Sequence, residues 1–330
     1  MFKGMNSHLN PQRHLEAIRS GDAHVLARAI TQVENRDPEA ISLLQAAFPY
    51  TGRAKKIGLA GPPGVGKSTL AGRLAQAYRE QGFRVAILAV DPSSPFGGGA
   101  MLGDRIRMRG QTGIYIRSMA TRGHRGGLAS TTVEVIDLLD AAGFERILVE
   151  SVGAGQDEVE IAFGVDTQLL LTAPGLGDSV QLLKAGLNEA ADIFVINKSD
   201  GQGVEWVAED IRTTLPLASR SNGWRVPVVF TNASAGGGTS SLLGFIEAHL
   251  RFLEQTGNYR TNSIQQWQIR IMQALRDAID RRFLSEGLRS RIAEYALQVA
   301  NENANPYQLV QTLLAEIGAS GRSADVGVSR

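Results

Sequence analysis

The apolar positions of this chain follow two periods, one typical of buried strands and one typical of helices. Seven short, mostly apolar runs predict strands, and helical spacing of apolar residues fills most of the stretches between them. The expected strands span residues 56–60, 84–90, 114–118, 146–151, 167–173, 192–197 and 226–231. Strands that alternate with helices favour a wound sheet. We therefore predict an α/β fold with a wound, mostly parallel sheet.

Both ends of the chain show helical spacing only. Residues 9–49 predict two or three short helices, and residues 240–253 predict the last helix of the sheet domain. After an expected connector at residues 258–262, three more helices follow; their apolar positions are Ile264, Trp267, Ile271, Leu275, Ile279, Ile292, Tyr295, Val299, Leu309, Leu313 and Ile317. The expected divisions are an N-terminal helical segment at 1–51, a sheet domain at 52–255, a helical arm at 256–318 and a disordered tail at 319–330.

A phosphate-binding loop is the strongest motif. The segment Gly61-Pro62-Pro63-Gly64-Val65-Gly66-Lys67-Ser68-Thr69 fits the pattern Gly, four residues, Gly-Lys-Ser/Thr, between an expected strand and a helix expected at residues 69–81. Its glycines let backbone N–H groups and a helix N-terminus point at phosphates. Lys67 is expected to reach the β- and γ-phosphates, and the Ser68 hydroxyl to hold Mg²⁺. The context disfavours a chance glycine-rich turn, so we expect a P-loop NTPase fold.

A second motif predicts guanine rather than adenine. The expected strand 192–197 ends in Asn197-Lys198-Ser199-Asp200, which matches Asn-Lys-x-Asp. The Asp200 carboxylate can accept hydrogen bonds from guanine N1–H and the exocyclic amine, whereas adenine offers no matching pair of donors. A backbone N–H in the turn after the last strand is expected to meet guanine O6; the candidates are Asn232, Ala233 and Ser234.

Three acidic residues are candidate Mg²⁺ ligands beside Ser68. Glu150 ends a strand and precedes Gly153, so the pair stands where GTPases usually show Asp-x-x-Gly, the acid near Mg²⁺ and the glycine at the γ-phosphate. Asp91 ends another strand, and Asp104 follows a glycine-rich stretch. Oxygen donors of this kind suit a hard cation. Helix capping or turn formation remains the structural alternative for Asp91 and Asp104.

Composition excludes several other classes of protein. Net charge is +1, from 34 basic and 33 acidic residues, without the basic footprint of a nucleic-acid binder. The absence of cysteine excludes disulfides, thiolate metal sites and cysteine nucleophiles. No apolar run reaches the roughly 18 residues of a membrane span, and residues 1–10 lack a signal-peptide core. We expect a cytoplasmic protein that binds neither membrane nor nucleic acid.

Together these residues resemble the MeaB/ArgK type of GTPase, the MMAA-like, methylmalonyl-CoA mutase-associated family, over residues 9–317. The segments that carry the resemblance are Gly61–Thr69, 90–95, 102–108, 118–124, 149–156, 174–178, Asn197–Asp200 and 305–307. The resemblance implies a SIMIBI-type GTPase with GTP or GDP and Mg²⁺ as ligands. It further implies a homodimer held by the C-terminal helices, and a chaperone that couples GTP to adenosylcobalamin loading and protection of an acyl-CoA mutase.

The resemblance places Lys67, Asp104 and Glu150 in the catalytic site, and Gln156 is a candidate to join them. GTPases of the Ras type carry a water-orienting glutamine directly after the Asp-x-x-Gly glycine, where this chain has Ala154. We therefore expect slow turnover by the protein alone and faster turnover when a partner completes the site.

Three alternatives stay open. A nickel-type metallochaperone GTPase shares the general fold, but it usually carries Cys or clustered His, and the five His here are scattered. A transport-linked, nucleotide-dependent kinase is a label given to some relatives, against which the guanine motif argues. A non-hydrolysing, nucleotide-gated interaction module would use the same binding residues. The sequence does not name the client mutase, the rates or the dimer geometry.

Overall fold

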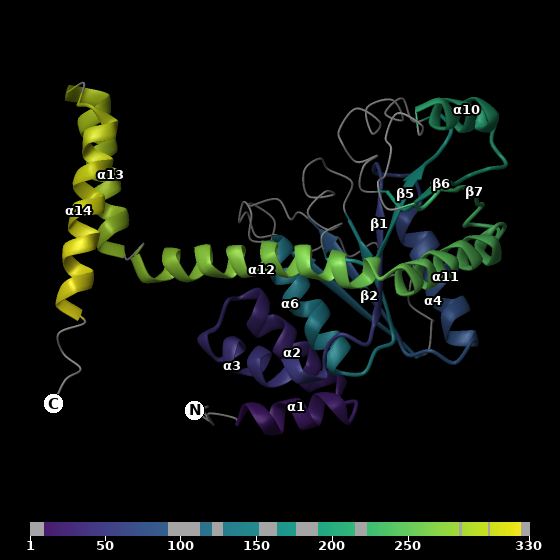
Figure 1. The fold of residues 1–330 in the computed structure, drawn as a ribbon, viewed down its shortest axis with the longest axis horizontal. Helices are drawn as coiled ribbons and strands as arrows, with labels where there is room; N and C mark the ends of the chain where they lie inside the picture. Colours follow the sequence, from purple (N-terminus) through teal and green to yellow (C-terminus); the bar gives the residue numbers. More distant parts are fainter. Residues whose placement is uncertain are drawn as a thin grey trace, which may run out of the picture. The chain divides into compact units, whose positions relative to one another are not determined.

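A parallel sheet of seven strands lies in the first of two compact units, which spans Met1–Gln266 (Figure 1). The computed structural model describes residues 10–91, 113–120, 128–151, 164–175, 191–214, 223–283, 286–302 and 304–324. The strands are β1 (Lys55–Ala60), β2 (Val85–Asp91), β3 (Ile114–Ala120), β4 (Arg146–Glu150), β5 (Thr167–Thr172), β6 (Ile193–Ile196) and β7 (Val228–Phe230). All seven expected strands are confirmed, with ends that shift by at most two residues.

The strand order is β3-β2-β4-β1-β5-β6-β7, and every described pairing is parallel. The strand that leads into the phosphate loop, β1, therefore lies between β4 and β5 in the middle of the sheet. Parallel strands all end at one edge, so the carboxyl ends of β1, β2, β4, β6 and β7 lie along the same edge of the sheet. This is the α/β P-loop NTPase fold that the sequence predicts.

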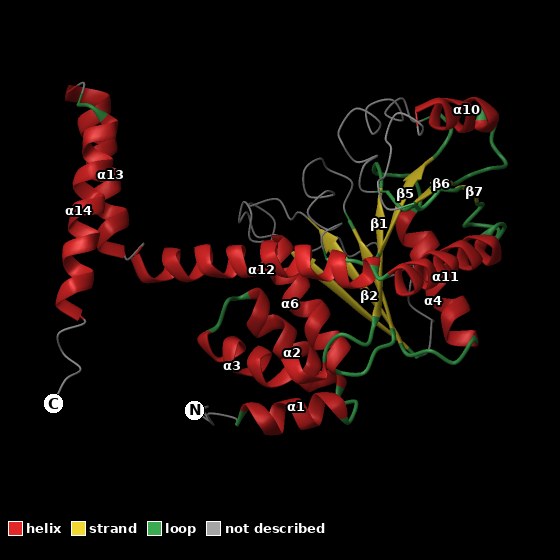
Figure 2. Cartoon of the chain, in the orientation of Figure 1, coloured by secondary structure: helices red, strands yellow, loops and turns green. Residues whose placement is uncertain are grey.

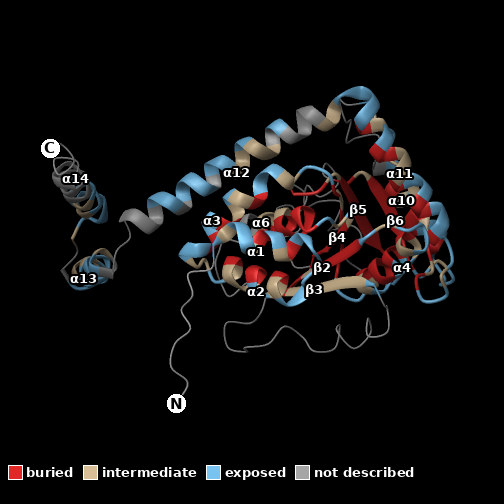
Figure 3. Cartoon of the chain, turned by 90° about the horizontal axis from the view of Figure 1, so that it is seen from below, coloured by how far each residue is buried: buried red, intermediate tan, exposed pale blue. Residues whose placement is uncertain are grey.

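Helices cover both faces of the sheet. The helices of this unit are α1 (Pro11–Arg19), α2 (Ala23–Glu34), α3 (Pro38–Ala47), the 3₁₀ helix η1 (Phe48–Tyr50), α4 (Lys67–Glu80), α6 (Leu128–Ala141), α10 (Val204–Thr214), α11 (Thr239–Thr256) and the start of α12 (Asn258–Phe283). One core joins α1, α2, α3 and α6 to Ala86 and Leu88 of β2. A second core joins α4 and α11 to Val85 and Ile87 of the same strand. Alternate residues thus enter opposite cores, which is why the strands read as continuous apolar runs. Figure 3 shows most of the sheet in the colour of buried residues.

Side-chain carboxylates hold the opposite, amino edge of the sheet. Asp140 of α6 accepts hydrogen bonds from the backbone N–H of Gly52 at 2.7 Å and of Ala54 at 3.0 Å. Asp166 accepts from Lys56 N–H at 2.8 Å, and Asp192 accepts from Gln168 N–H at 2.7 Å. These carboxylates bond N–H groups just before β1 or near the starts of β1 and β5, so they help to fix where each strand begins.

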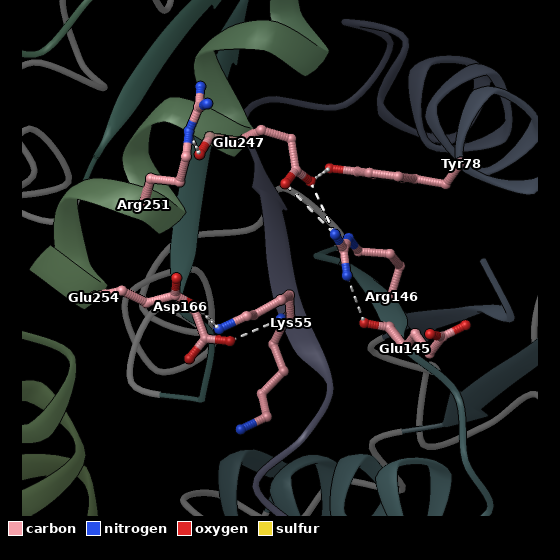
Figure 4. A network of polar contacts seen from close by, with 9 residues as sticks. Lys55, Tyr78, Glu145, Arg146, Asp166, Glu247, Arg251 and Glu254 are labelled. Carbon is pink, nitrogen blue, oxygen red and sulfur yellow. Dashed lines mark hydrogen bonds and ion pairs between the residues drawn. The ribbon is translucent and has the colours of Figure 1, made fainter. Parts of the chain in front are cut away.

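A larger polar network lies beside this edge (Figure 4). Glu247 of α11 accepts a hydrogen bond from the Tyr78 hydroxyl at 3.0 Å and pairs with Arg146 at 3.2 Å. Burial, with the Glu247 carboxylate nearby, raises the pKa of Tyr78 above its ordinary value. Burial likewise raises the pKa of Asp166, although the charge of Lys56 and its backbone hydrogen bond oppose the shift. The network joins α4, α11 and β4 at one end of the sheet.

The second unit, Trp267–Arg330, is helical in its described residues (Figure 2). It holds the rest of α12, α13 (Glu286–Glu302) and α14 (Pro306–Ala324), of which α13 packs against α14. These helices confirm the three that the sequence predicts. Many large apolar side chains of the unit are exposed: Ile271, Met272, Leu275, Ile279, Ile292, Leu297, Tyr307, Val310 and Leu314.

Two helix boundaries differ from the prediction by more than three residues. The expected connector at residues 258–262 is wrong, because α11 ends at Thr256, Gly257 caps it in the left-handed region at φ 72°, and α12 begins at Asn258. A single left-handed glycine is enough to end one helix, and the polar residues after it start another. The helix α14 also runs past Gly318 to Ala324, farther than expected. Within the described ranges, no helix combines the length and apolarity needed to cross a bilayer.

Candidate functional site

The phosphate loop, Gly61–Thr69, joins the end of β1 to the start of α4, as the sequence predicts. Two of its glycines are required by close neighbours. A Cβ on Gly61, where φ is 143°, would lie 2.3 Å from the carbonyl oxygen of Leu171 in β5. A Cβ on Gly66, where φ is 98°, would lie 2.4 Å from the side-chain nitrogen of Asn197. The loop is therefore packed tightly against β5 and the end of β6, and only glycine fits at these positions.

Lys67 is buried at the first position of α4, only 6% exposed. Its Nζ donates hydrogen bonds to the carbonyl oxygens of Gly61 at 2.6 Å and Pro62 at 3.1 Å. A buried ammonium group is costly unless such partners compensate for its lost hydration. The carbonyl oxygens carry only partial charge, so an anionic phosphate group in the loop would be a stronger partner.

Ser68 and Glu150 come together at the carboxyl edge. The Ser68 hydroxyl donates to Glu150 Oε1 at 2.5 Å, and Glu150 is 8% exposed. The contact follows from strand register, because Leu59 of β1 pairs with Glu150 at the end of β4. A hydroxyl and a carboxylate at this position are the oxygen donors that Mg²⁺ prefers.

The other expected metal ligands are only partly placed. Asp91 ends β2, the neighbour of β4, and lies two residues beyond Ala89, which pairs with Glu150. Asp104, Gly153 and Gln156 lie outside the described residues. Among the residues that are described, no three His, Asp or Glu side chains form a metal-binding group. The described part therefore supplies the Ser68–Glu150 pair and the backbone position of Asp91.

The side chain of Asn197 ties the phosphate loop to the loop after β7, residues 231–238, which we call the β7 loop. Asn197 is 2% exposed at the end of β6. Its Nδ2 donates to the Val65 carbonyl at 2.8 Å, and its Oδ1 accepts from Thr231 Oγ1 at 3.1 Å and from Ala233 N–H at 3.0 Å. One buried amide thus holds the loop expected at the phosphates and the loop expected at the base in fixed relation.

The residues expected at the guanine base lie on exposed backbone beside this amide. Lys198 adopts a left-handed conformation at φ 55°, and Gly201 N–H closes the turn on the Lys198 carbonyl at 3.0 Å. Ser199 N–H donates to the Thr231 carbonyl at 3.0 Å, which joins the motif to the β7 loop. Asp200 is exposed, so its carboxylate is accessible to a ligand.

Of the three candidates for the guanine O6 contact, the geometry favours Ser234. The N–H of Asn232 donates to the Gly237 carbonyl at 2.9 Å, and that of Ala233 donates to Asn197. Within the described part of the chain, the N–H of Ser234 has no such partner. The Asn232 side chain holds the turn, since its Oδ1 accepts from the Ser234 hydroxyl at 2.7 Å and from Ala235 N–H at 3.2 Å.

Sequence reasoning missed one residue of this region. Arg73 of α4 donates from Nε to the Ala233 carbonyl at 3.0 Å and from Nη2 to the Ser234 carbonyl at 2.7 Å. A lone arginine on an exposed helix face has no pattern that distinguishes it from solvated surface charge. Its partners are main-chain carbonyls about 160 positions away, which no side-chain motif reveals.

Comparison with known proteins agrees with this geometry. The family model described as "Methylmalonyl Co-A mutase-associated GTPase MeaB" matches residues 26–287. A protein of Pyrococcus abyssi named as a GTPase is 42% identical over 315 residues, which cover 94% of this chain and 97% of that protein. The GTPase ArgK of Escherichia coli is 42% identical over 194 residues, 57% of this chain and 59% of ArgK. A crystal structure described as an LAO/AO transport system kinase superposes with a TM-score of 0.71 at 27% identity, over 96% of this chain and all of that one.

Proposed function

Because this chain belongs to the MeaB family of methylmalonyl-CoA mutase-associated GTPases and is a GTPase, we propose that it acts as a chaperone of a cobalamin-dependent acyl-CoA mutase. Binding and hydrolysis of GTP would gate the loading of adenosylcobalamin and the protection or reactivation of the mutase. The observation that supports this most is the Asn197 side chain, which links the phosphate loop to the β7 loop. A change in the phosphate loop would therefore reach the β7 loop through this one side chain.

Each described side chain has a distinct role in this proposal. Lys67 would exchange the carbonyls of Gly61 and Pro62 for the β- and γ-phosphates, where its charge offsets the charge of the transferred group. Ser68 and Glu150 would hold Mg²⁺, with Asp91 and Asp104 as further proposed ligands. When bound, Mg²⁺ would supply charge neutralisation across the β- and γ-phosphate oxygens.

Guanine would be recognised at the other end of the site. The Asp200 carboxylate would accept from N1–H and the exocyclic amine, and Ser234 N–H would donate to O6. Lys198 in its left-handed turn would place its aliphatic stem beside the base. We propose that turnover without a partner is slow, because Ala154 stands where a water-orienting glutamine is common and Gln156 lies farther along.

We further propose that the protein is a homodimer and that its second unit forms the dimer contact. The support is the exposed apolar surface of α12, α13 and α14, including Ile271 at 63%, Leu297 at 62% and Leu314 at 62% exposed. Apolar side chains of this size and number are usually covered in an assembly. Sedimentation equilibrium of the full chain measures this directly, and a monomer at micromolar concentration would contradict it.

The test of the function is steady-state GTP hydrolysis by the full chain, with and without a cobalamin-dependent acyl-CoA mutase from the same organism. We expect slow basal turnover that the mutase stimulates, and no stimulation in the Lys67→Ala variant. Turnover without stimulation by any such mutase would contradict the chaperone role and leave the GTPase intact. Asp200→Asn should in parallel shift preference from guanosine to xanthosine triphosphate, since the amide can donate to the xanthine C2 oxygen.

A further inference from the structure

The β7 loop ends in three consecutive glycines, after the turn that the Asn232 side chain holds. Residues Gly236, Gly237 and Gly238 follow one another, and two of them have positive φ, 81° and 76°. Consecutive glycines lose more conformational entropy on ordering than other residues do. A loop that must present one N–H to a base therefore needs bonds from outside the loop to fix its peptide planes.

Arg73 provides such bonds from the helix of the phosphate loop. It lies on α4, six residues after Lys67, and its guanidinium donates to the carbonyls of Ala233 and Ser234 at 3.0 and 2.7 Å. Both bonds come from a single planar group with fixed donor directions. Arg73 therefore sets the orientation of two successive peptide planes of the β7 loop.

The geometry of a trans peptide gives this orientation a consequence. The carbonyl of Ala233 and the N–H of Ser234 belong to the same planar unit and point in opposite directions. When Arg73 binds the carbonyl from the side of α4, the Ser234 N–H is directed away from α4. The next plane is held from both sides, because Arg73 binds the Ser234 carbonyl and Asn232 Oδ1 accepts from Ala235 N–H.

We propose that Arg73 is a positioning residue for recognition of the 6-oxo group of guanine. It acts through the Ala233–Ser234 peptide, whose N–H it directs at O6, and it touches no part of the nucleotide. The inference rests on the proposed placement of guanine between Asp200 and Ser234. It predicts that Arg73 contributes to the affinity for 6-oxopurine nucleotides and contributes little where the group at C6 is a poor acceptor.

The test compares three nucleoside diphosphates, which bind without turnover. GDP and inosine diphosphate both carry the 6-oxo group, whereas 6-thio-GDP keeps the groups that face Asp200 and replaces O6 with a weakly accepting sulfur. Dissociation constants are measured by calorimetry on the full chain, its Arg73→Met variant and its Arg73→Lys variant. Methionine keeps an apolar stem without donors, and lysine keeps the charge without the two-donor fork.

We expect Arg73→Met to weaken GDP and inosine diphosphate by about tenfold each, and 6-thio-GDP by about twofold or less, the range of one hydrogen bond. Arg73→Lys should lie between the parent and Arg73→Met. The matched control is Arg79→Met, which removes the same charge from α4 at a residue bonded to the Phe83 carbonyl. All three ligands should bind this control as they bind the parent.

Equal weakening of all three ligands would show that Arg73 only supports the fold, and unchanged binding of all three would show that the bonds to the loop do not matter; either result overturns the proposal. Thermal unfolding of each variant checks that it is folded. The guanine placement itself is tested separately by the parent, which must bind GDP far more tightly than ADP. If it does not, the proposed function fails before any variant is made.

Discussion

Polar side chains at the two edges of the sheet have different kinds of hydrogen-bond partner. At the amino edge, Asp140, Asp166 and Asp192 accept hydrogen bonds from backbone N–H groups in or just before the strands. At the carboxyl edge, Lys67 donates hydrogen bonds to neutral carbonyl oxygens, and the Ser68 hydroxyl donates to Glu150. Bonds of the first kind are internal to the fold, whereas those of the second kind join groups that a phosphate and a metal ion would bind more strongly.

This difference separates charged side chains that stabilise the fold from those that are placed to bind a ligand. A carboxylate that bonds several main-chain donors leaves those donors unsatisfied when it is removed, so its loss is a loss of folding free energy. A buried cation loses its hydration on folding, which offsets what its hydrogen bonds contribute, so its removal need not destabilise the protein. Removal of a buried charged side chain is therefore expected to lower stability at the amino edge and to lower nucleotide binding at the carboxyl edge.

Lys67→Ala tests the carboxyl edge and should have the largest effect. We expect GTP turnover to fall by about two to three orders of magnitude, because the main cation at the transferred phosphate is lost. The free energy of unfolding should stay the same or rise. Phosphate release and urea unfolding measure the two quantities. A variant that loses stability along with turnover would break the comparison between the edges.

Asp140→Ala tests the amino edge and should show the reverse pattern. Its carboxylate is 2% exposed and bonds the N–H groups of Gly52 and Ala54. We expect unfolding free energy to fall by about 3 kcal/mol, since buried donors are left unpaired. The affinity for GDP should change less than about twofold. Asp140→Asn keeps one acceptor oxygen and is the control, with a loss about half as large.

The pH dependence of stability sharpens the comparison at Asp166. Burial raises the pKa of this carboxyl in the folded state. The folded protein then binds the proton more tightly than the unfolded chain does, so stability from this group is greatest at low pH and falls as pH rises through the folded pKa. Asp166→Asn cannot titrate. The parent should therefore lose unfolding free energy relative to this variant as pH rises above about 4, the ordinary value for an aspartate.

Urea unfolding of both proteins at several pH values gives that difference directly. A parent that instead gains stability relative to Asp166→Asn as pH rises would mean that Lys56 and its N–H outweigh desolvation. Asp166 would then behave as an ordinary ion pair at the edge of the fold.

Tyr78→Phe should have the smallest effect. The change removes only the hydroxyl that donates to Glu247 at 3.0 Å, while the buried ring keeps its packing against Phe83. Glu247 keeps its ion pair with Arg146. We expect a loss of about 1 kcal/mol in urea unfolding, the usual net value of one hydrogen bond. A loss above about 3 kcal/mol would mean that the whole network depends on this hydroxyl.

The sheet could be predicted from the sequence because both of its faces are buried. Residues such as Val85 to Leu88 enter cores on alternate sides, so each strand is a short apolar run between turn residues. The start of α12 could not be predicted in the same way. Residues 258–263 are mostly polar and precede the apolar positions that begin at Ile264, so one left-handed glycine could not be told from a longer connector.

For the candidate site, the residues that belong to motifs could be predicted from the sequence. The residues that position the loops and strands through backbone hydrogen bonds could not. Lys67, Ser68 and Asn197 belong to patterns of spacing, and the described structure brings them to one edge. Arg73 acts on main-chain carbonyls of a distant loop, and Asp140 acts on main-chain N–H groups. Contacts of a side chain with a remote backbone leave no periodicity or motif, so only the folded chain reveals them.

The strand order also sets when a newly made chain can first bind nucleotide. The phosphate loop is synthesised early, after β1, but β1 lies between β4 and β5, and Asn197 bonds to Thr231 and Ala233. The site is therefore incomplete until the segment through β7 and its loop has left the ribosome. Nucleotide binding on stalled nascent chains would begin only beyond that length, which makes it a reporter of how far the sheet has assembled.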